Sequence, residues 1–376
     1  MKNFYYIATE AISKNFLDNY FINDLIGKYS VHYLFLNTKK LPNIEKNKKF
    51  NMINCSEFSN SEYLFKFLKT NAKKSEPVIL FFLPTDVVSK SIYAYCSHLN
   101  LRISYIDWGG AIKSRISSNN RILLFLFNHE FLFFIRNIIH KIFFRKIVSV
   151  DTVFFSGLKP RSTAHLLKPR YTININFFDI NRFEKCNVPL DFKNKKYAVF
   201  LDVNMIEHPD YRLLGYEKIN SEQYYKNLNS FFDYLEKKHK LKIIVCPHPT
   251  TTLSEAVNFL GRTVISNNSA GMVKQSSFVI SHHSTSVTYA VLAFKPIIFI
   301  YDNQIKATYK NIYRHILGKS YMLKQSIVNI SLRSNYNSYA LTLCKPTYKK
   351  YIKNYHSRQG ISPDSDSKIF CSHFNI

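Results

Sequence analysis

A histidine between two prolines follows an apolar run in the stretch Leu241–Leu260 (LKIIVCPHPTTTLSEAVNFL). The run Lys242–Cys246 predicts a strand, Pro247–Pro249 predicts a rigid turn, and Thr250 supplies a hydroxyl for the start of a helix. A helix N-terminus offers free backbone N–H groups and partial positive charge, and His248 adds a hydrogen-bond donor. The stretch therefore predicts a site for a phosphate, with an ordinary turn as the simpler alternative.

A second junction of this kind lies about thirty residues further on. Phe278–Ser281 predicts a strand, His282–Ser286 (HHSTS) the loop after it, and Val287–Phe294 a helix. The hydroxyl residues of this loop are Ser284, Thr285 and Ser286. Small hydroxyl side chains can cap a helix and bond phosphate oxygens, although plain capping is the alternative. The two histidines invite a metal interpretation, but no carboxylate stands at ligand spacing, so we expect no metal.

Short apolar runs alternate with longer amphipathic stretches along most of the chain, which is typical of βα units in a parallel sheet. Candidate strands of the first half are Asn3–Ala8, Val31–Asn37, Val78–Leu83, Arg102–Ile106 and Val153–Ser156. Those of the second half are Ala198–Val203, Lys242–Cys246, Thr263–Ser266, Phe278–Ser281 and Ile297–Tyr301. The pattern predicts two doubly wound α/β halves, whose ligands bind at the carboxyl ends of the strands.

The organisation of the 376 residues follows from a break in this pattern. Residues 180–196 lose periodicity and gather charge, so we place the domain junction there. The prediction is an N-terminal domain over 1–185, a C-terminal domain over 197–330, and a partly flexible tail over 331–376. Within that tail Lys345–Lys353 (KPTYKKYIK) predicts a last helix, packed on the first domain or facing lipid.

The segment Arg121–Ser149 is very apolar but broken by charged residues. Charges at these positions would each cost about 2.5–3.5 kcal/mol at the centre of a bilayer, so a spanning helix is not expected. A helix lying in the interface, held by anionic headgroups, is one interpretation. A pair of buried core helices is the other.

The composition limits the partners. Lys and Arg exceed Asp and Glu by 52 − 25 = 27, which points to nucleic acid, anionic lipid or a charged nucleotide substrate. The six cysteines have no paired spacing, so neither a zinc cluster nor a disulfide-linked secreted domain is indicated. The N-terminal residues predict a first strand rather than a signal peptide.

The strand–PHP–helix of Cys246–Leu260, followed by the HHSTS loop and KPIIFI, resembles motifs of a known group. It is similar to the His-Pro and Ser/Thr motifs of bacterial GT-B glycosyltransferases that use CMP-activated acidic sugars: sialyltransferases and the transferases of Kdo and other nonulosonic acids. The resemblance covers residues 197–302. It implies a GT-B architecture, with two Rossmann-like domains facing a central cleft, and a CMP phosphate held by His248 and the Ser/Thr loop. Pro249 and Thr250 follow that histidine directly.

The same resemblance implies a general base in the first domain, where the family has two acids before a glycine. The matching stretch Ser104–Ile112 (SYIDWGGAI) has one acid, Asp107, followed by Trp108, which could stack on a sugar. A role for Asp107 in a turn or helix cap is the alternative. Asp202 and Glu207 rank behind it as acids near the cleft. Asn268, in the loop Ser266–Gly271, is a candidate contact to the cytidine.

We therefore expect an enzyme: a metal-independent glycosyltransferase that moves an acidic sugar from a CMP-sugar to a surface glycan, such as lipopolysaccharide, O-antigen or capsule. The expected location is cytoplasmic, on the inner face of the plasma membrane. No cofactor is expected beyond the donor substrate. One alternative is a polyol-phosphate transferase that uses CDP-glycerol. A nucleic-acid-binding protein is another, but no helix-turn-helix, zinc-finger or RNP signature supports it.

Overall fold

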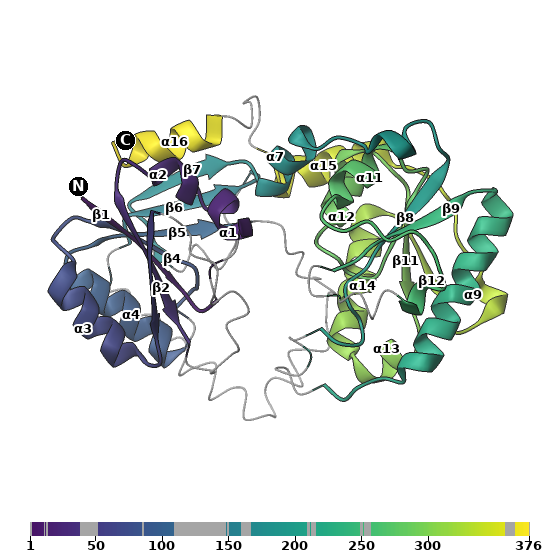
Figure 1. Cartoon of the computed structure of the whole chain (residues 1–376), viewed down its shortest axis with the longest axis horizontal. Helices are drawn as coiled ribbons and strands as arrows, with labels where there is room; N and C mark the ends of the chain where they lie inside the picture. The colour runs from purple at the N-terminus through teal and green to yellow at the C-terminus, as the bar shows by residue number, and fades with distance from the viewer. Residues whose placement is uncertain are drawn as a thin grey trace, which may run out of the picture. The chain divides into compact units, whose positions relative to one another are not determined.

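The chain folds into two compact units, each built on a parallel sheet (Figure 1). The computed structural model describes residues 2–10, 12, 14–37, 52–84, 86–108, 148, 150–158, 167–208, 211, 216–248, 251, 257–357 and 365–375. Unit 1 comprises the described residues up to 178 together with 357 and 365–375. Unit 2 comprises those from 179 to 356.

The described residues of unit 1 form a seven-stranded sheet in the order β3-β2-β1-β4-β5-β6-β7, with every pair parallel. The strands are β1 (Asn3–Ala8), β2 (Ser30–Leu36), β3 (Ile53–Phe58), β4 (Pro77–Leu80), β5 (Arg102–Asp107), β6 (Thr152–Ser156) and β7 (Tyr171–Ile175). Alternate residues of a strand face opposite sides of the sheet. In β1, Tyr5 and Ile7 join one apolar cluster, while Phe4 and Tyr6 join the other. Both faces are therefore covered, as a parallel sheet requires.

Different helices cover these two faces. The helices of unit 1 are α1 (Lys14–Asn19), α2 (Ile22–Leu25), α3 (Ser61–Asn71), α4 (Val87–His98) and α16 (Ser365–His373). Leu64 of α3 and Ile92 of α4 pack in the cluster with Tyr5. Ile22 of α2 and Phe370 of α16 pack in the cluster with Phe4. The α4 helix begins at a capping box, a reciprocal pair of hydrogen bonds that fixes its first turn.

The helix from the tail that packs on unit 1 is α16. The ring of Phe370 stacks on Phe21 with centroids 4.6 Å apart, and Phe374 meets Phe4 edge-on at 5.0 Å. The helix α15 (Lys345–Tyr355), which covers the predicted segment Lys345–Lys353, packs on α12 (Val287–Leu292) and α14 (Lys310–Leu323) of unit 2.

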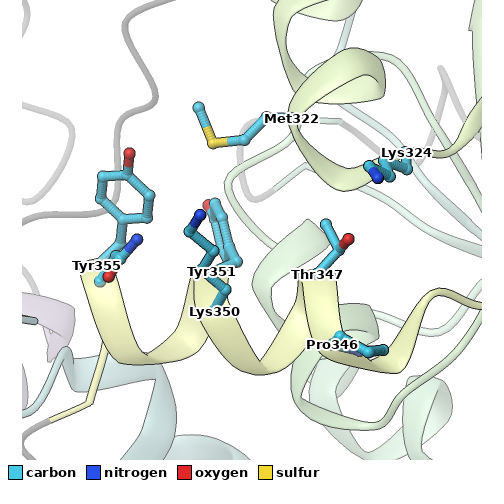
Figure 2. A pocket seen from close by; sticks show the side chains of 8 residues that line it. Met322, Lys324, Pro346, Thr347, Lys350, Tyr351 and Tyr355 are labelled. Carbon is cyan, nitrogen blue, oxygen red and sulfur yellow. The ribbon is translucent and has the colours of Figure 1, made fainter.

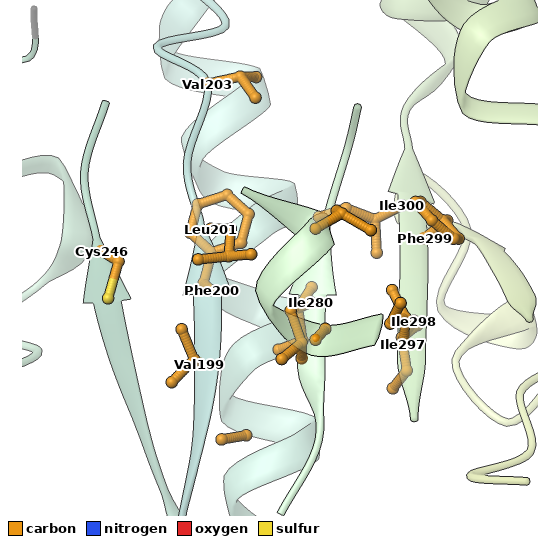
Figure 3. Packing of buried hydrophobic residues seen from close by; sticks show 14 of the residues in the cluster. Val199, Phe200, Leu201, Val203, Cys246, Ile280, Ile297, Ile298, Phe299 and Ile300 are labelled. Atoms are coloured by element: carbon orange, nitrogen blue, oxygen red, sulfur yellow. The ribbon is translucent and has the colours of Figure 1, made fainter. Parts of the chain in front are cut away.

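The described residues of unit 2 form a five-stranded parallel sheet in the order β12-β11-β10-β8-β9. The strands are β8 (Tyr197–Leu201), β9 (Lys242–Cys246), β10 (Val279–Ser281), β11 (Ile297–Tyr301) and β12 (Ser326–Asn329). Figure 3 shows Val199, Phe200 and Ile280 among the buried side chains of adjacent strands. The next strand in sequence after β8 is β9, which lies on one side of β8, and the strand after that is β10, which lies on the other side. The strand order therefore reverses between β8 and β10.

Helices lie on both sides of this sheet. They are α7 (Phe178–Lys185), α9 (Ser221–His239), α11 (Ser269–Gln275), α12 (Val287–Leu292), α13 (Asn303–Thr308), α14 (Lys310–Leu323) and α15, with 3-10 turns at Leu190–Phe192, Val257–Phe259 and Arg333–Asn335. Figure 1 shows α9 on one side of the sheet and α11 and α12 on the other. This is a doubly wound arrangement.

The units divide between Phe178 and Asp179, slightly before the junction predicted at residues 180–196. Asp179 is buried and accepts a hydrogen bond of 2.7 Å from the hydroxyl of Tyr289 in α12. Phe183 of the same helix α7 stacks near Tyr289, with ring centroids 6.4 Å apart. These contacts attach α7 to unit 2, although its charged sequence looks like a linker.

The two parallel sheets confirm the predicted α/β class. The predicted strand Thr263–Ser266 is a single bridge between Val264 and Val245. The strands β3, β7 and β12 were not predicted. The segment Arg121–Ser149 lies outside the described residues except for Val148. Among the helices that the structure describes, none combines the length and apolarity needed to cross a bilayer.

Candidate functional site

The carboxyl ends of β8, β9 and β10 lie along one edge of the sheet of unit 2, because all three strands are parallel. The strand order reverses between β8 and β10, and ligands of open α/β sheets bind at such reversal points. Both predicted motifs are at this edge: His248 follows β9, and the HHSTS loop follows β10. The sheet therefore brings the two junctions together within one unit.

Asp202 lies between the two motifs, directly after β8. Its side chain is buried, and its carboxylate accepts backbone N–H bonds from Val203, Asn204 and His248. The hydroxyl of Thr251 donates a further hydrogen bond of 3.3 Å. Burial raises the pKa of Asp202 to about 6, and these hydrogen bonds oppose the rise. Asp202 therefore fixes the turn after β9, which is a positioning role rather than that of an exposed acid.

His248 is half-buried, and its ring lies 4.8 Å from the ring of His208, measured between centroids. His208 stacks in turn on Tyr211 at 5.1 Å. The charge of His208 also acts on His283 in the HHSTS loop. Histidines that follow three adjacent strands therefore form one cluster.

His282 is fully buried at the start of the HHSTS loop. Its Nε2 atom lies 3.3 Å from the hydroxyl of Tyr224, while its Nδ1 atom has no hydrogen-bond partner among the described residues. Burial lowers the pKa of His282 to about 3, so its ring is neutral at physiological pH. A neutral imidazole with a buried, unsatisfied nitrogen costs stability unless a ligand or water meets it.

His283 presents a second such nitrogen. Its Nδ1 atom is buried and has no partner within the described chain. Burial, followed by the charges of Lys319, His282 and His315, lowers the pKa of His283 well below its usual range. A negative ligand would reverse the electrostatic part of this shift, since it favours the protonated ring.

Lys319 lies behind this loop, on the buried side of α14. Its ammonium donates to the carbonyl of His283 at 2.6 Å and to the carbonyl of Ser284 at 2.9 Å. Burial lowers the pKa of Lys319 to about 8. The lysine holds the loop in place and adds positive charge beneath it.

The HHSTS loop does not begin α12 in the way that the sequence predicts. Ser286 is the N-cap residue of α12 but makes no side-chain capping bond, and the helix ends at Leu292. Instead, the hydroxyl of Ser284 accepts the N–H of Ser286 at 3.2 Å. The first N–H groups of the helix bond back to the carbonyls of residues 284–286. The predicted free N–H groups are thus partly used, because the first turn closes with short i to i+3 bonds.

The other residues of unit 2 that the sequence predicts for the site make the following contacts. Asn268 caps α11 by accepting the N–H of Gly271 at 3.2 Å, and its amide donates to the carbonyl of Asn187. Glu207 forms a salt bridge of 2.6 Å with Lys218. Thr285 is exposed at the loop. The residues outside the described part of this site are Pro249 and Thr250.

Asp107 is the last residue of β5 in unit 1, at the carboxyl edge of that sheet, and is buried. The adjacent Trp108 is half-buried among aromatic rings, with Phe178 edge-on at 5.3 Å and Tyr20 at 5.8 Å. These contacts occupy part of the indole that was predicted to stack on a sugar.

The sequence motifs did not identify two residues at this site, His208 and Lys319. His208 belongs to a second His-Pro pair, His208–Pro209, which repeats the dipeptide of the first motif. Lys319 stands on the apolar face of α14, in register with buried Ile312 and Ile316. A lysine at such a position is the signal that could have identified it. Among the described residues, no group of three or more His, Cys, Asp or Glu is arranged to hold a metal ion.

Comparisons with known proteins identify the fold. No family model matches the chain, and no curated protein does. The solved structure of CalG4, a calicheamicin glycosyltransferase, has 8% identity and a TM-score of 0.50, over 94% of each chain. This chain has the GT-B fold, in agreement with the prediction. At this identity the likeness shows the fold alone.

Two further solved structures cover this chain completely. A UDP-N-acetylglucosamine 2-epimerase from Listeria monocytogenes, described as putative, has 10% identity and a TM-score of 0.49, with 97% of its own chain covered. A variant of the wall teichoic acid polymerase TagF has 14% identity and a TM-score of 0.47, with 88% of its chain covered.

Proposed function

We propose that this protein is a glycosyltransferase that moves an acidic sugar from a CMP-sugar to a glycan acceptor, without a metal. The observation that carries the proposal is the cluster at the carboxyl edge of the sheet in unit 2. There the ring of His248 lies 4.8 Å from that of His208, whose charge acts on His283. His282 and His283 each have a buried nitrogen without a partner among the described residues, and Lys319 donates to the loop that holds them. The fold shared with CalG4, which is named a glycosyltransferase, supports the reaction class.

The cluster suits the phosphate of the donor. During transfer the bond between the anomeric carbon and the phosphate oxygen breaks, and CMP leaves with its electron pair. His248 and His283 can donate hydrogen bonds to that phosphate, while the fixed charge of Lys319 lies below the loop. Charge that is held in place before the reaction stabilises a leaving group without reorganisation. The choice of CMP rests on the resemblance of the PHP and HHSTS motifs.

The acceptor requires a base. Asp107 is proposed to take the proton of the acceptor hydroxyl as its oxygen bonds to the anomeric carbon. Its place at the end of β5 suits this role, because functional groups of such sheets gather at the carboxyl ends of strands. The proposed location, at the inner face of the plasma membrane, suits an acceptor that is carried on lipid.

The direct experiment supplies the purified protein with CMP-sialic acid, CMP-Kdo or CDP-glycerol and measures the release of CMP by anion-exchange chromatography. We expect release from a CMP-sugar, and at least a tenfold slower rate in His248→Ala, since a hydrogen bond to a charged group contributes about 1.5–3 kcal/mol. Thr285→Ala, at an exposed position of the same edge, should lose less.

If the protein turned over CDP-glycerol but no CMP-sugar, the donor would be CDP-glycerol, and the proposed phosphate site would stand. Full activity of His248→Ala on an identified donor would remove His248 from the mechanism.

A further inference from the structure

A long stretch of unit 2 contains no acidic residue. Residues 303–356 hold ten Lys or Arg and no Asp or Glu. With 25 acids in 376 residues, a stretch of this length would be expected to hold about four. The stretch includes α13, α14, β12 and α15, and α14 packs against α13 and α15. These elements therefore carry positive charge and have no acid of their own to neutralise it.

A pocket of about 430 Å³ opens in this surface, between the end of α14 and one side of α15 (Figure 2). Its lining residues are Met322, Lys324, Pro346, Thr347, Lys350, Tyr351, Asn354 and Tyr355. Figure 2 shows Lys350, Tyr351 and Tyr355 rising from α15 towards the end of α14, where Met322 and Lys324 lie. The pocket combines two cationic side chains with an aromatic and thioether wall.

The two lysines are available to a ligand. Lys324 and Lys350 are both exposed, and the salt bridges of the described chain include neither. An ammonium without a carboxylate partner keeps its full charge for an anion. The pocket is therefore complementary to a phosphate group with a less polar body attached to it.

The surroundings of the pocket favour a lipid over a small soluble phosphate. Tyr321, next to the lining residue Met322, is 89% exposed, although it is a large aromatic side chain. Tyrosine is enriched where membranes meet water, because its ring lies among the headgroups while its hydroxyl stays hydrated. Basic residues beside such a ring add attraction to anionic lipids.

We propose that the α14–α15 pocket binds the phosphate headgroup of an anionic phospholipid and attaches unit 2 to a membrane surface. Lys324 and Lys350 contact the phosphate, and the wall formed by Met322 and Tyr355 receives the adjoining glycerol. This binding does not depend on the transferase reaction or on the histidine cluster.

The test is cosedimentation of the full chain with vesicles of phosphatidylcholine alone, or with about 30 mol% phosphatidylglycerol. Each lysine near an anionic surface strengthens binding about fivefold, so Lys324→Gln/Lys350→Gln should bind the anionic vesicles about 25-fold more weakly. The matched control, Lys306→Gln/Lys310→Gln, removes the same charge from the same acid-free stretch but outside the pocket. It should lose no more than a few-fold. Circular dichroism confirms that each variant is folded.

Several outcomes would overturn the proposal. Equal losses in the two double variants would show diffuse attraction without a pocket. Equal binding to vesicles of phosphatidylcholine alone would show that the phosphate charge of an anionic lipid is not recognised. Tight binding of inorganic phosphate or soluble glycerol phosphate at the pocket, without vesicle binding, would make the ligand a free phosphate. Unchanged CMP binding by Lys324→Gln/Lys350→Gln is expected, and it separates this site from the proposed donor site.

Discussion

Replacing Lys319 with methionine should alter the pH dependence of stability more than stability itself. The ammonium donates to the carbonyls of His283 and Ser284 from a site that is 8% exposed. Methionine fills a similar volume but leaves both carbonyls without this donor, at a cost of about 1–3 kcal/mol each. Removing the buried charge has the opposite effect. A pKa lowered from 10.5 to about 8 corresponds to about 3 kcal/mol, so the two effects largely cancel near neutral pH.

The sign of the pH effect follows from proton counts. The pKa of Lys319 is lower in the folded state, so the unfolded chain binds more protons and the free energy of unfolding rises with pH. The penalty of the buried charge is complete below about pH 8 and disappears as the pH rises towards 10.5. From about pH 7 to 9.5 the wild type should gain about 2 kcal/mol relative to Lys319→Met.

Urea denaturation of both proteins at a series of pH values measures this difference, because the titrations common to both cancel. A difference in unfolding free energy that stays constant over this range would refute the buried ammonium beneath the HHSTS loop.

Three further outcomes are expected. Affinity for CMP should rise as the pH falls towards the lowered pKa of His283, because the phosphate favours the protonated ring. His283→Gln should flatten this profile in calorimetric titrations. Iodoacetamide near neutral pH should modify Cys344 before Cys55, although Cys55 is the more exposed residue, because hydrogen bonds from Thr347 lower the pKa of the Cys344 thiol while partial desolvation raises that of Cys55. Peptide mass spectrometry measures both rates, and equal rates would contradict this. Phe370→Ala should destabilise unit 1 by about 3–5 kcal/mol in thermal unfolding, and an unchanged midpoint would show that α16 is not anchored by this ring.

The sequence predicted those elements whose side chains are apolar on both faces. β1, β9 and β11 were predicted with their observed bounds, because buried parallel strands are continuous apolar runs. β3 (INCSEF) and β12 (SIVN) carry polar residues and lie at the edges of their sheets, so the same pattern could not identify them. The helix α16 was missed because a few aromatic contacts, not periodicity, attach it to unit 1.

The sequence predicted where the two motifs lie in the sheet but not which side chains gather around them. The PHP and HHSTS motifs follow β9 and β10, as their apolar runs indicated. The motifs predict free N–H groups at the helix starts, but the first turn of α12 bonds to its own loop, and side chains supply the polar groups. Lys319 is distant in sequence from both motifs. Only the packing of α14 places it under the HHSTS loop.

Calorimetric titration of CMP into the wild type and His283→Ala tests the central claim most directly, with Lys350→Gln as a variant that leaves the cluster intact. We predict that CMP binds the wild type and Lys350→Gln alike and binds His283→Ala about 10- to 100-fold more weakly, as the loss of a hydrogen bond to a charged group implies. Equal affinity for all three proteins, or no binding of CMP by the wild type, would contradict a nucleotide phosphate site at the carboxyl ends of β8 and β10.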